Sequence, residues 1–188
     1  HTFILFSSLS VYGRIEAPVV DETTPVREPD AYGQAKRQAE DWVAAKGNSF
    51  RSLALRLPGI IGHGSVRNWL THVLASARSG REIVVVNPDT PFNNAVHASD
   101  LVRFAARLLE QHWEKSEPVT LGAAGKITAG EAVQILADAF GGRSHIRQEI
   151  SPPRGFVVSS VRARERYGYE PMEIGAMLRQ FAAENADS

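Results

Sequence analysis

Residues 2–13 read "TFILFSSLSVYG", and this stretch decides the fold class because a nearly continuous apolar run gives way to serines and a glycine. Such a run is typical of a strand buried on both faces, as in a parallel sheet. Ser7, Ser8 and Ser10 follow where the strand runs into a loop. Ligands of open α/β sheets bind at the carboxyl ends of strands. We therefore expect a functional hydroxyl here, while two of the three serines merely end the strand.

The next segments predict an α/β layer. Residues 11–30 are rich in Pro, Gly and acids and indicate an ordered loop. Asp30 is a suitable N-cap for a helix over about 31–46, which Gly47-Asn48 would end. "FRSLALRLPGIIG", residues 50–62, then predicts a second buried strand stopped by Pro58-Gly59. The order strand, loop, helix, strand favours a parallel sheet with right-handed crossovers.

The second half alternates less regularly, which favours a smaller α+β lobe packed on the sheet. Thr128 and Glu131 form a capping-box pattern at the start of one helix. The predicted strands are "EIVVV" (82–86), "PVTLGAA" (118–124) and "HIRQEI" (145–150), and the predicted helices cover about 67–79, 99–111, 128–141, 161–167 and 172–185.

Composition narrows the class of partner. At 188 residues the chain suits one domain, and its 21 basic residues balance its 21 acidic ones. This balance argues against nucleic acid and membrane surfaces as partners and favours a small-molecule substrate. No apolar run reaches the ~18 residues of a membrane span, and no signal peptide is evident, so we expect a cytoplasmic protein. Cysteine is absent and the six histidines are scattered, so no metal site is predicted.

Tyr32 and Lys36 lie four places apart in "DAYGQAKRQAE", residues 30–40. On a helix this spacing puts both side chains on one face. A neighbouring ammonium favours the phenolate and lowers the pKa of a tyrosine from its usual value near 10, which suits it to general acid/base work. Such a pair also occurs by chance on many helix surfaces, so the interpretation depends on its context.

Five segments in order supply that context: "FSSLSVYG", "DETTP", "YGQAKRQAE", "LALRLPGIIGHG" and "NAVHASDLV". Together they resemble the extended short-chain dehydrogenases/reductases, the family of NAD-dependent epimerases and dehydratases, firmly over 2 to about 110 and loosely beyond. The resemblance implies an α/β fold with a partial Rossmann-like parallel sheet and a smaller α+β C-terminal substrate lobe. It assigns 1–62 and about 83–111 to the Rossmann part, and about 63–82 and 112–188 mainly to the lobe.

The resemblance also implies roles for individual residues. Ser8, Tyr32 and Lys36 match the catalytic serine, tyrosine and lysine, and the lysine also holds the nicotinamide ribose of NAD or NADP. Pro58 and Gly59 match the segment that lies against the nicotinamide, although an ordinary strand stop is an alternative. For the substrate we expect contacts from Ser8, Ser10, Arg67, Asn68 and Asn94. Arg67 and Asn68 could instead be an exposed helix start.

Several departures from the family pattern qualify these roles. The glycine-rich "GxxGxxG" turn that receives the dinucleotide pyrophosphate is missing. The acidic or basic residue that separates NAD from NADP is missing too, so the two cofactors cannot be distinguished. We therefore expect the chain to be the C-terminal part of a longer protein and to bind a dinucleotide weakly unaided. An exposed sheet edge and apolar face would then favour association of the protein with other copies of itself, as a homo-oligomer.

Other departures concern the substrate. Gly59 replaces an Asn, and Asn93-Asn94 replace an Arg-Asp pair, at positions that contact the diphosphate in nucleotide-sugar enzymes of the family. An amide does not replace the bidentate charge of arginine, so a nucleotide-sugar substrate is in doubt. Leu9 replaces an acidic residue of the sugar dehydratases, which argues against dehydration. His97 matches a family histidine that we interpret as structural.

The leading hypothesis is an NAD(P)-dependent oxidoreductase or epimerase that transfers a hydride at an alcohol carbon of a sugar or sugar-like substrate. The sequence does not separate epimerisation from reduction. The alternatives are a carbonyl reductase of a small polar non-sugar compound and a non-catalytic relative that senses a cofactor. A third is that these residues alone are catalytically inert.

Overall fold

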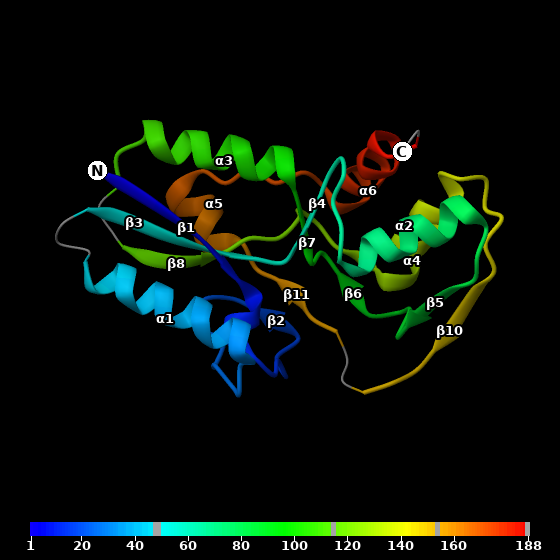
Figure 1. The fold of residues 1–188 in the computed structure, drawn as a ribbon, viewed down its shortest axis with the longest axis horizontal. Helices are drawn as coiled ribbons and strands as arrows, with labels where there is room; N and C mark the ends of the chain where they lie inside the picture. Colours follow the sequence, from blue (N-terminus) through cyan, green and yellow to red (C-terminus); the bar gives the residue numbers. More distant parts are fainter. Residues whose placement is uncertain (47–49, 114–115, 153–154, 187–188) are drawn as a thin grey trace.

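The structure is a computed structural model that describes residues 1–46, 50–113, 116–152 and 155–186. Figure 1 shows a small sheet at one end of the molecule, with α1 (Ala31–Ala45) on one side of it and α3 (Ala98–Glu110) and α5 (Val161–Tyr167) on the other. The helices α2 (Trp69–Ser79), α4 (Ala129–Asp138) and α6 (Ile174–Glu184) gather at the opposite end (Figure 1). No helix among the described residues is both long and apolar enough to cross a membrane.

The sheet contains β1 (Thr2–Ser8), β3 (Arg51–Leu57) and β8 (Glu117–Thr120), in the order β1-β3-β8 and all parallel. Residues of β3 alternate between the two faces, as the period of a strand requires. Leu53, Leu55 and Leu57 pack into the core under α3 (Ala98–Glu110) and α5 (Val161–Tyr167). The parallel sheet predicted from the two apolar runs is thus confirmed.

The first strand departs from its prediction. It pairs only with β3 at one edge of the described sheet, and Phe3 and Phe6 are 42% and 48% exposed. The prediction of a strand buried on both faces is therefore wrong for β1, because nothing among the described residues covers its outer side. The exposed edge and apolar side chains expected from the sequence are present.

The predicted loop after β1 contains a short 3-10 helix, η1 (Leu9–Tyr12), and a two-residue strand, β2 (Val19–Val20). It leads into α1 (Ala31–Ala45), where the Asp30 side chain accepts a hydrogen bond of 2.7 Å from the Gly33 amide. The predicted N-cap is thus confirmed. The predicted helix end at Gly47-Asn48 lies outside the described residues.

The predicted strand over 50–62 divides in two. After β3 the chain leaves the sheet, and β4 (Gly59–Ile61) pairs in parallel with β7 (Ala95–His97). Pro58 separates them, because it has no amide hydrogen to continue the ladder. The remaining strands are β5 (Ile83–Val86), β6 (Pro91–Phe92), β9 (Ile127–Thr128), β10 (Ile146–Glu149) and β11 (Val157–Val158).

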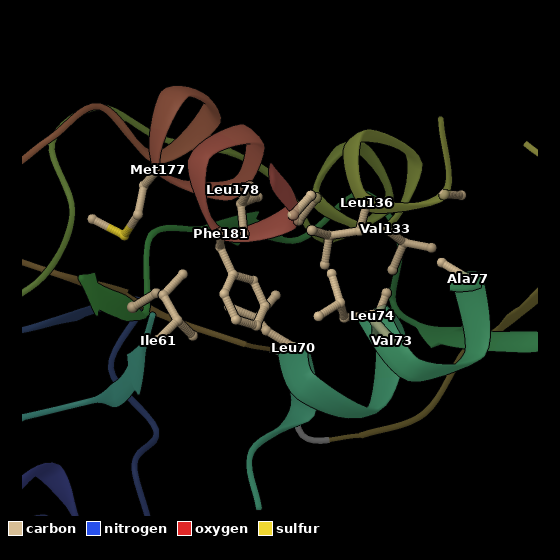
Figure 2. Close-up of a cluster of buried hydrophobic side chains, with 14 of the residues drawn as sticks. Ile61, Leu70, Val73, Leu74, Ala77, Val133, Leu136, Met177, Leu178 and Phe181 are labelled. Atoms are coloured by element: carbon tan, nitrogen blue, oxygen red, sulfur yellow. The ribbon is translucent and has the colours of Figure 1, made fainter. Parts of the chain in front are cut away.

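A second core joins α2 (Trp69–Ser79), α4 (Ala129–Asp138) and α6 (Ile174–Glu184). Figure 2 shows Leu70 and Leu74 of α2 facing Leu136 of α4 and Phe181 of α6. The capping box of Thr128 and Glu131, predicted for α4, is confirmed.

The two cores divide the chain differently from the sequence-based assignment at a few elements. Strand β5, assigned to the Rossmann part, packs in the α2–α4–α6 core. Conversely, β8 and α5, assigned mainly to the lobe, pack against β3 and α3. The reason is that β8 extends the sheet in parallel beside β3, a pairing between distant segments that local sequence does not encode.

Candidate active site

Two predicted site segments meet at the carboxyl edge of the sheet. Ser8 is in register with Leu57 in the parallel pairing, so Ser8 and Pro58 leave the sheet at the same edge. Ser8 is the N-cap of η1: its Oγ accepts from the Ser10 amide at 3.1 Å and donates to the Ser10 hydroxyl at 3.1 Å. The two half-buried hydroxyls therefore form one polar turn at the end of β1.

Tyr32 and Lys36 share one face of α1, as their spacing predicts. The Lys36 Nζ lies 5.7 Å from the centroid of the Tyr32 ring, within the range of a cation–π contact. The same Nζ donates a hydrogen bond of 2.8 Å to the carbonyl of Phe6 in β1. Tyr32 is 55% exposed, so its phenol is accessible to a ligand. The ammonium thus lies beside the phenol and against the strand that carries Ser8.

Gly33 explains how closely the helix approaches the serine turn. A Cβ at this position would lie 2.1 Å from the Ser10 carbonyl oxygen, which no real side chain could tolerate. The helix backbone beside Tyr32 therefore touches the turn formed by Ser8 and Ser10. The backbone of α1 next to Tyr32 thus lies against the carboxyl end of β1, where Ser8, Ser10 and Pro58 are found, and Lys36 bonds to the same strand.

A second group of predicted residues meets on the lobe side. A Cβ on Gly59 would lie 3.7 Å from the Asn68 Cβ and 4.0 Å from the Asn94 carbonyl oxygen. Because Gly59 directly follows Pro58, the backbone links this group to the first. The structure leaves Arg67 exposed with a positive φ of 63°, and no contact of its side chain with the other candidates is recorded among the described residues.

Asn68 and Asn93 are occupied by structural hydrogen bonds. The Asn68 Oδ1 accepts from the Thr71 amide at 2.9 Å and caps α2, while its Nδ2 donates to the Ile60 carbonyl at 3.1 Å. The buried Asn93 amide donates to the carbonyls of Ala123 and Val158 and accepts from the Val158 amide at 2.7 Å. Asn93 therefore ties three segments together.

Asn94 differs from these two asparagines. Its Oδ1 is buried and has no hydrogen-bond partner among the described residues. The residue borders a mainly apolar cavity of about 440 Å³, where Trp69 and Phe92 meet edge to face at 5.3 Å between ring centroids. Phe156 and Val86 also line it.

The sequence analysis missed a buried polar network beside the site. Arg56 of β3 and Glu40 of α1 are 3% and 6% exposed and form a 2.7 Å ion pair. Burial raises the pKa of Tyr12, a member of the network, to about 12. Burial alone lowers the pKa of Arg56, but its bonds to Glu40 and Tyr12 outweigh this and raise it. The available signal was a single arginine inside the apolar run "LALRLPG", which requires a buried acid as its partner.

His97 fits the structural role expected for it. Its side chain is 3% exposed, its Nδ1 lies 2.8 Å from the Ser99 hydroxyl and its Nε2 lies 3.1 Å from the Glu184 carboxylate. It also caps α3. Ser7 is likewise buried and bonded to Glu40, so it stays out of the candidate site.

This arrangement was compared with known proteins. Residues 1–122 match the family model described as the NAD dependent epimerase/dehydratase family. The chain belongs to that family. The match contains Ser8, Tyr32, Lys36 and the groups around Gly59, so the resemblance carried by the five sequence segments is confirmed.

Several solved structures have a similar fold, and two of the three described next are named as epimerases. RMD from Pseudomonas aeruginosa, complexed with NADPH, is 22% identical with a TM-score of 0.78, and the match covers 97% of this chain and 66% of that one. UDP-glucuronic acid 4-epimerase from Bacillus cereus, in complex with NAD, is 15% identical with a TM-score of 0.82, covering 97% and 60%. UDP-glucose 4-epimerase from Thermotoga maritima, with UDP-glucose, is 18% identical with a TM-score of 0.75, covering 97% and 62%.

These likenesses establish the fold: an α/β architecture with part of a Rossmann-like parallel sheet and a second, smaller lobe. The chain spans less than two thirds of the length of each of these structures. A search of curated proteins found no match.

Proposed function

We propose that this member of the epimerase/dehydratase family takes part in NAD(P)-dependent hydride transfer at an alcohol carbon of a sugar-like small molecule. The observation that carries the proposal is that α1, which bears Tyr32 and Lys36, packs against the carboxyl end of β1, which bears Ser8. A hydroxyl, an accessible phenol and an ammonium at one strand end are the groups that a proton exchange with an alcohol requires. Family membership supports the same reaction class.

The residues present fit the nicotinamide end of a dinucleotide. Lys36 donates to a main-chain carbonyl, a neutral partner that ribose hydroxyls could replace. Pro58 and Gly59 lie beside the same strand end and offer a backbone surface without a bulky side chain at Gly59. The glycine-rich turn for the pyrophosphate is not in this sequence. When bound, the nicotinamide would accept or return the hydride, and either NAD or NADP is compatible with these residues.

Each residue then has a defined task. The Ser8 hydroxyl orients the hydroxyl or carbonyl of the substrate, and the Tyr32 phenol exchanges a proton with that oxygen. Lys36 places a positive charge beside the phenol. The remainder of the substrate lies toward the cavity that Asn94 borders.

Two observations bear on the substrate class. Asn93 replaces the arginine expected for a diphosphate, and its side chain is already hydrogen-bonded to the main chain of Ala123 and Val158. Gly59 offers no side chain to a phosphate. Both support a substrate whose recognition does not depend on a diphosphate at these positions, although similar structures include enzymes named for UDP-sugars.

An isotope experiment tests the reaction class. Protein from the whole reading frame that contains these residues is incubated with NAD or NADP and with alcohols deuterated at the carbinol carbon, namely free aldoses and UDP-glucose. We expect the deuterium to appear on the cofactor if the reaction is a reduction or oxidation, and on the epimeric product if it is an epimerisation. Loss of the deuterium to water during turnover would instead indicate proton abstraction and contradict the proposal.

A further inference from the structure

The helix that carries Tyr32 and Lys36 has an unusual inner face. Its buried residues are Gly33, Glu40 and Val43, and only Val43 is an apolar side chain of any size. None of the three belongs to the apolar clusters found in the described part of the chain. Helices are ordinarily held on a sheet by an apolar stripe. The position of α1 therefore depends on polar contacts more than on apolar packing.

Glu40 makes most of those polar contacts. Its carboxylate accepts a hydrogen bond of 2.6 Å from the Ser7 hydroxyl of β1. It also accepts from the Arg56 guanidinium of β3 at 3.0 and 2.7 Å, in a two-point arrangement. Arg56 donates in addition to the Tyr12 hydroxyl of η1 at 2.8 Å. One buried ion pair thus joins α1 to both strands and to the turn that begins at Ser8.

The neighbouring contact of Lys36 gives this pair a specific importance. Lys36 and Glu40 are one helical turn apart and bond to consecutive residues of β1, Phe6 and Ser7. If Lys36 releases the Phe6 carbonyl to hold a ribose, the link from Glu40 to β1 and β3 remains. The spacing between Tyr32 and Ser8 would then be maintained by Glu40 and Arg56.

We propose that Glu40 and Arg56 are positioning residues that hold the Tyr32 helix at the correct distance from Ser8 for proton exchange. This inference rests on the proposed function. A buried ion pair is weak evidence for stability, because well-packed apolar residues can replace it with little loss, but it fixes geometry through directional bonds. The pair should therefore matter more for turnover than for folding.

The test replaces both charges with apolar side chains, in the double variant Glu40→Met/Arg56→Met of the whole protein. Residues 1–188 contain no cysteine, so spin labels can be attached at Asp41→Cys on α1 and Val102→Cys on α3, both exposed positions, once any cysteine elsewhere in the whole protein has been replaced by serine. We expect a folded protein whose label distance distribution is shifted or broadened relative to the labelled parent. With the same alcohol as substrate as in the deuterium experiment, kcat should fall at least about tenfold. KM for the cofactor, which depends on Lys36 of the same helix, should rise by a smaller factor than kcat falls.

Two further variants complete the design. Ser7→Ala removes only the hydrogen bond from Glu40 to β1 and leaves the ion pair with Arg56 intact, so it serves if the double variant does not fold. Its kcat should fall in the same direction. Glu117→Gln is the matched control, since Glu117 pairs with Arg162 and Arg166 away from α1, and it should leave kcat and the label distance unchanged.

Parental kcat and an unchanged label distance in a folded Glu40 variant would overturn the inference. The turnover of Tyr32→Phe distinguishes failure of this inference from failure of the proposed function. If Tyr32→Phe abolishes turnover while the Met pair preserves it, only the positioning role is wrong. If Tyr32→Phe leaves turnover intact, the proposed function is wrong, and the label distances still report whether the pair places the helix.

Discussion

At the residue scale, the sequence identified the side chains whose role depends on local spacing. Tyr32 and Lys36 share a helix face because they lie four residues apart, and this could be read without coordinates. The helix start offered as the alternative for Asn68 could also be read, because its capping partner Thr71 is three residues away. The task of Asn93 could not, because Asn93 bonds to a residue 65 positions away. Glu40 was overlooked for the same reason: its partners Ser7 and Arg56 come from two strands.

Lys36 provides the prediction that belongs to this scale. Lys36→Met keeps the aliphatic stem and removes the charge, so the phenol of Tyr32 loses its cationic neighbour and the ribose loses its proposed donor. We expect kcat to fall and KM for the dinucleotide to rise, each by about tenfold or more, as for the loss of a charge-assisted contact. Steady-state kinetics at varied cofactor concentration measures both. An unchanged KM for the cofactor would contradict the ribose-binding role.

At the element scale, long periodic segments were predictable and short strands were not. Predicted helices over about 67–79 and 99–111 correspond to α2 (Trp69–Ser79) and α3 (Ala98–Glu110) within two residues. Strand β2 has only two residues and exists because it pairs with β11, which is far away in the sequence. Local patterns cannot specify such a pairing.

Gly33 tests how α1 is seated. Gly33→Ala would add a Cβ 2.1 Å from the Ser10 carbonyl, so the helix must move away from the serine turn. Alanine favours a helix by up to about 1 kcal/mol, but overpacking costs about 1–3 kcal/mol, so we expect a net loss of stability. Displacement of Tyr32 from Ser8 should also lower kcat by at least about tenfold.

Urea denaturation and turnover of Gly33→Ala measure the two effects. Gly175→Ala is a suitable control, because the nearest heavy atoms to a Cβ there lie 3.7 Å away or more and belong to side chains. A Gly33→Ala protein with parental stability and kcat would show that α1 does not rest on the serine turn.

At the scale of the whole molecule, the two larger cores meet through the backbone that carries the site. One core packs α3 and α5 on the sheet, and the other packs α2, α4 and α6 (Figures 1 and 2). The segment from Leu57 to Gly59 passes from the first to the second, so both site groups depend on how the two cores are joined. The sequence predicted both parts, but not that β8 and α5 belong with the sheet.

Acid stability can be predicted at this scale from Glu117, which joins β8 to α5. Its partial burial alone raises its pKa, but hydrogen bonds from Tyr167 and Arg166 and the charges of Arg162 and Arg166 lower it below the ordinary value of 4.5. A depressed folded-state pKa contributes stability above pH 4.5, and this contribution is lost as the pH falls through the lower folded value.

Glu117→Gln should therefore lower the free energy of unfolding at neutral pH. It should also make the decline below pH 4.5 shallower than in the parent. Denaturation curves at a series of pH values give the comparison. Two curves that run parallel through this range would contradict the assignment.

The central claim is that the Tyr32 phenol exchanges a proton with the alcohol whose carbon undergoes hydride transfer. The most direct measurement is kcat for Tyr32→Phe beside Tyr167→Phe, which removes the same oxygen atom from a phenol that bonds to Glu117 away from the site. General acid/base catalysis contributes about 10²–10⁴-fold to a rate. We therefore expect the kcat of Tyr32→Phe to be lower than that of the parent by this factor and the kcat of Tyr167→Phe to equal that of the parent. A Tyr32→Phe protein with the turnover of its parent would contradict the account.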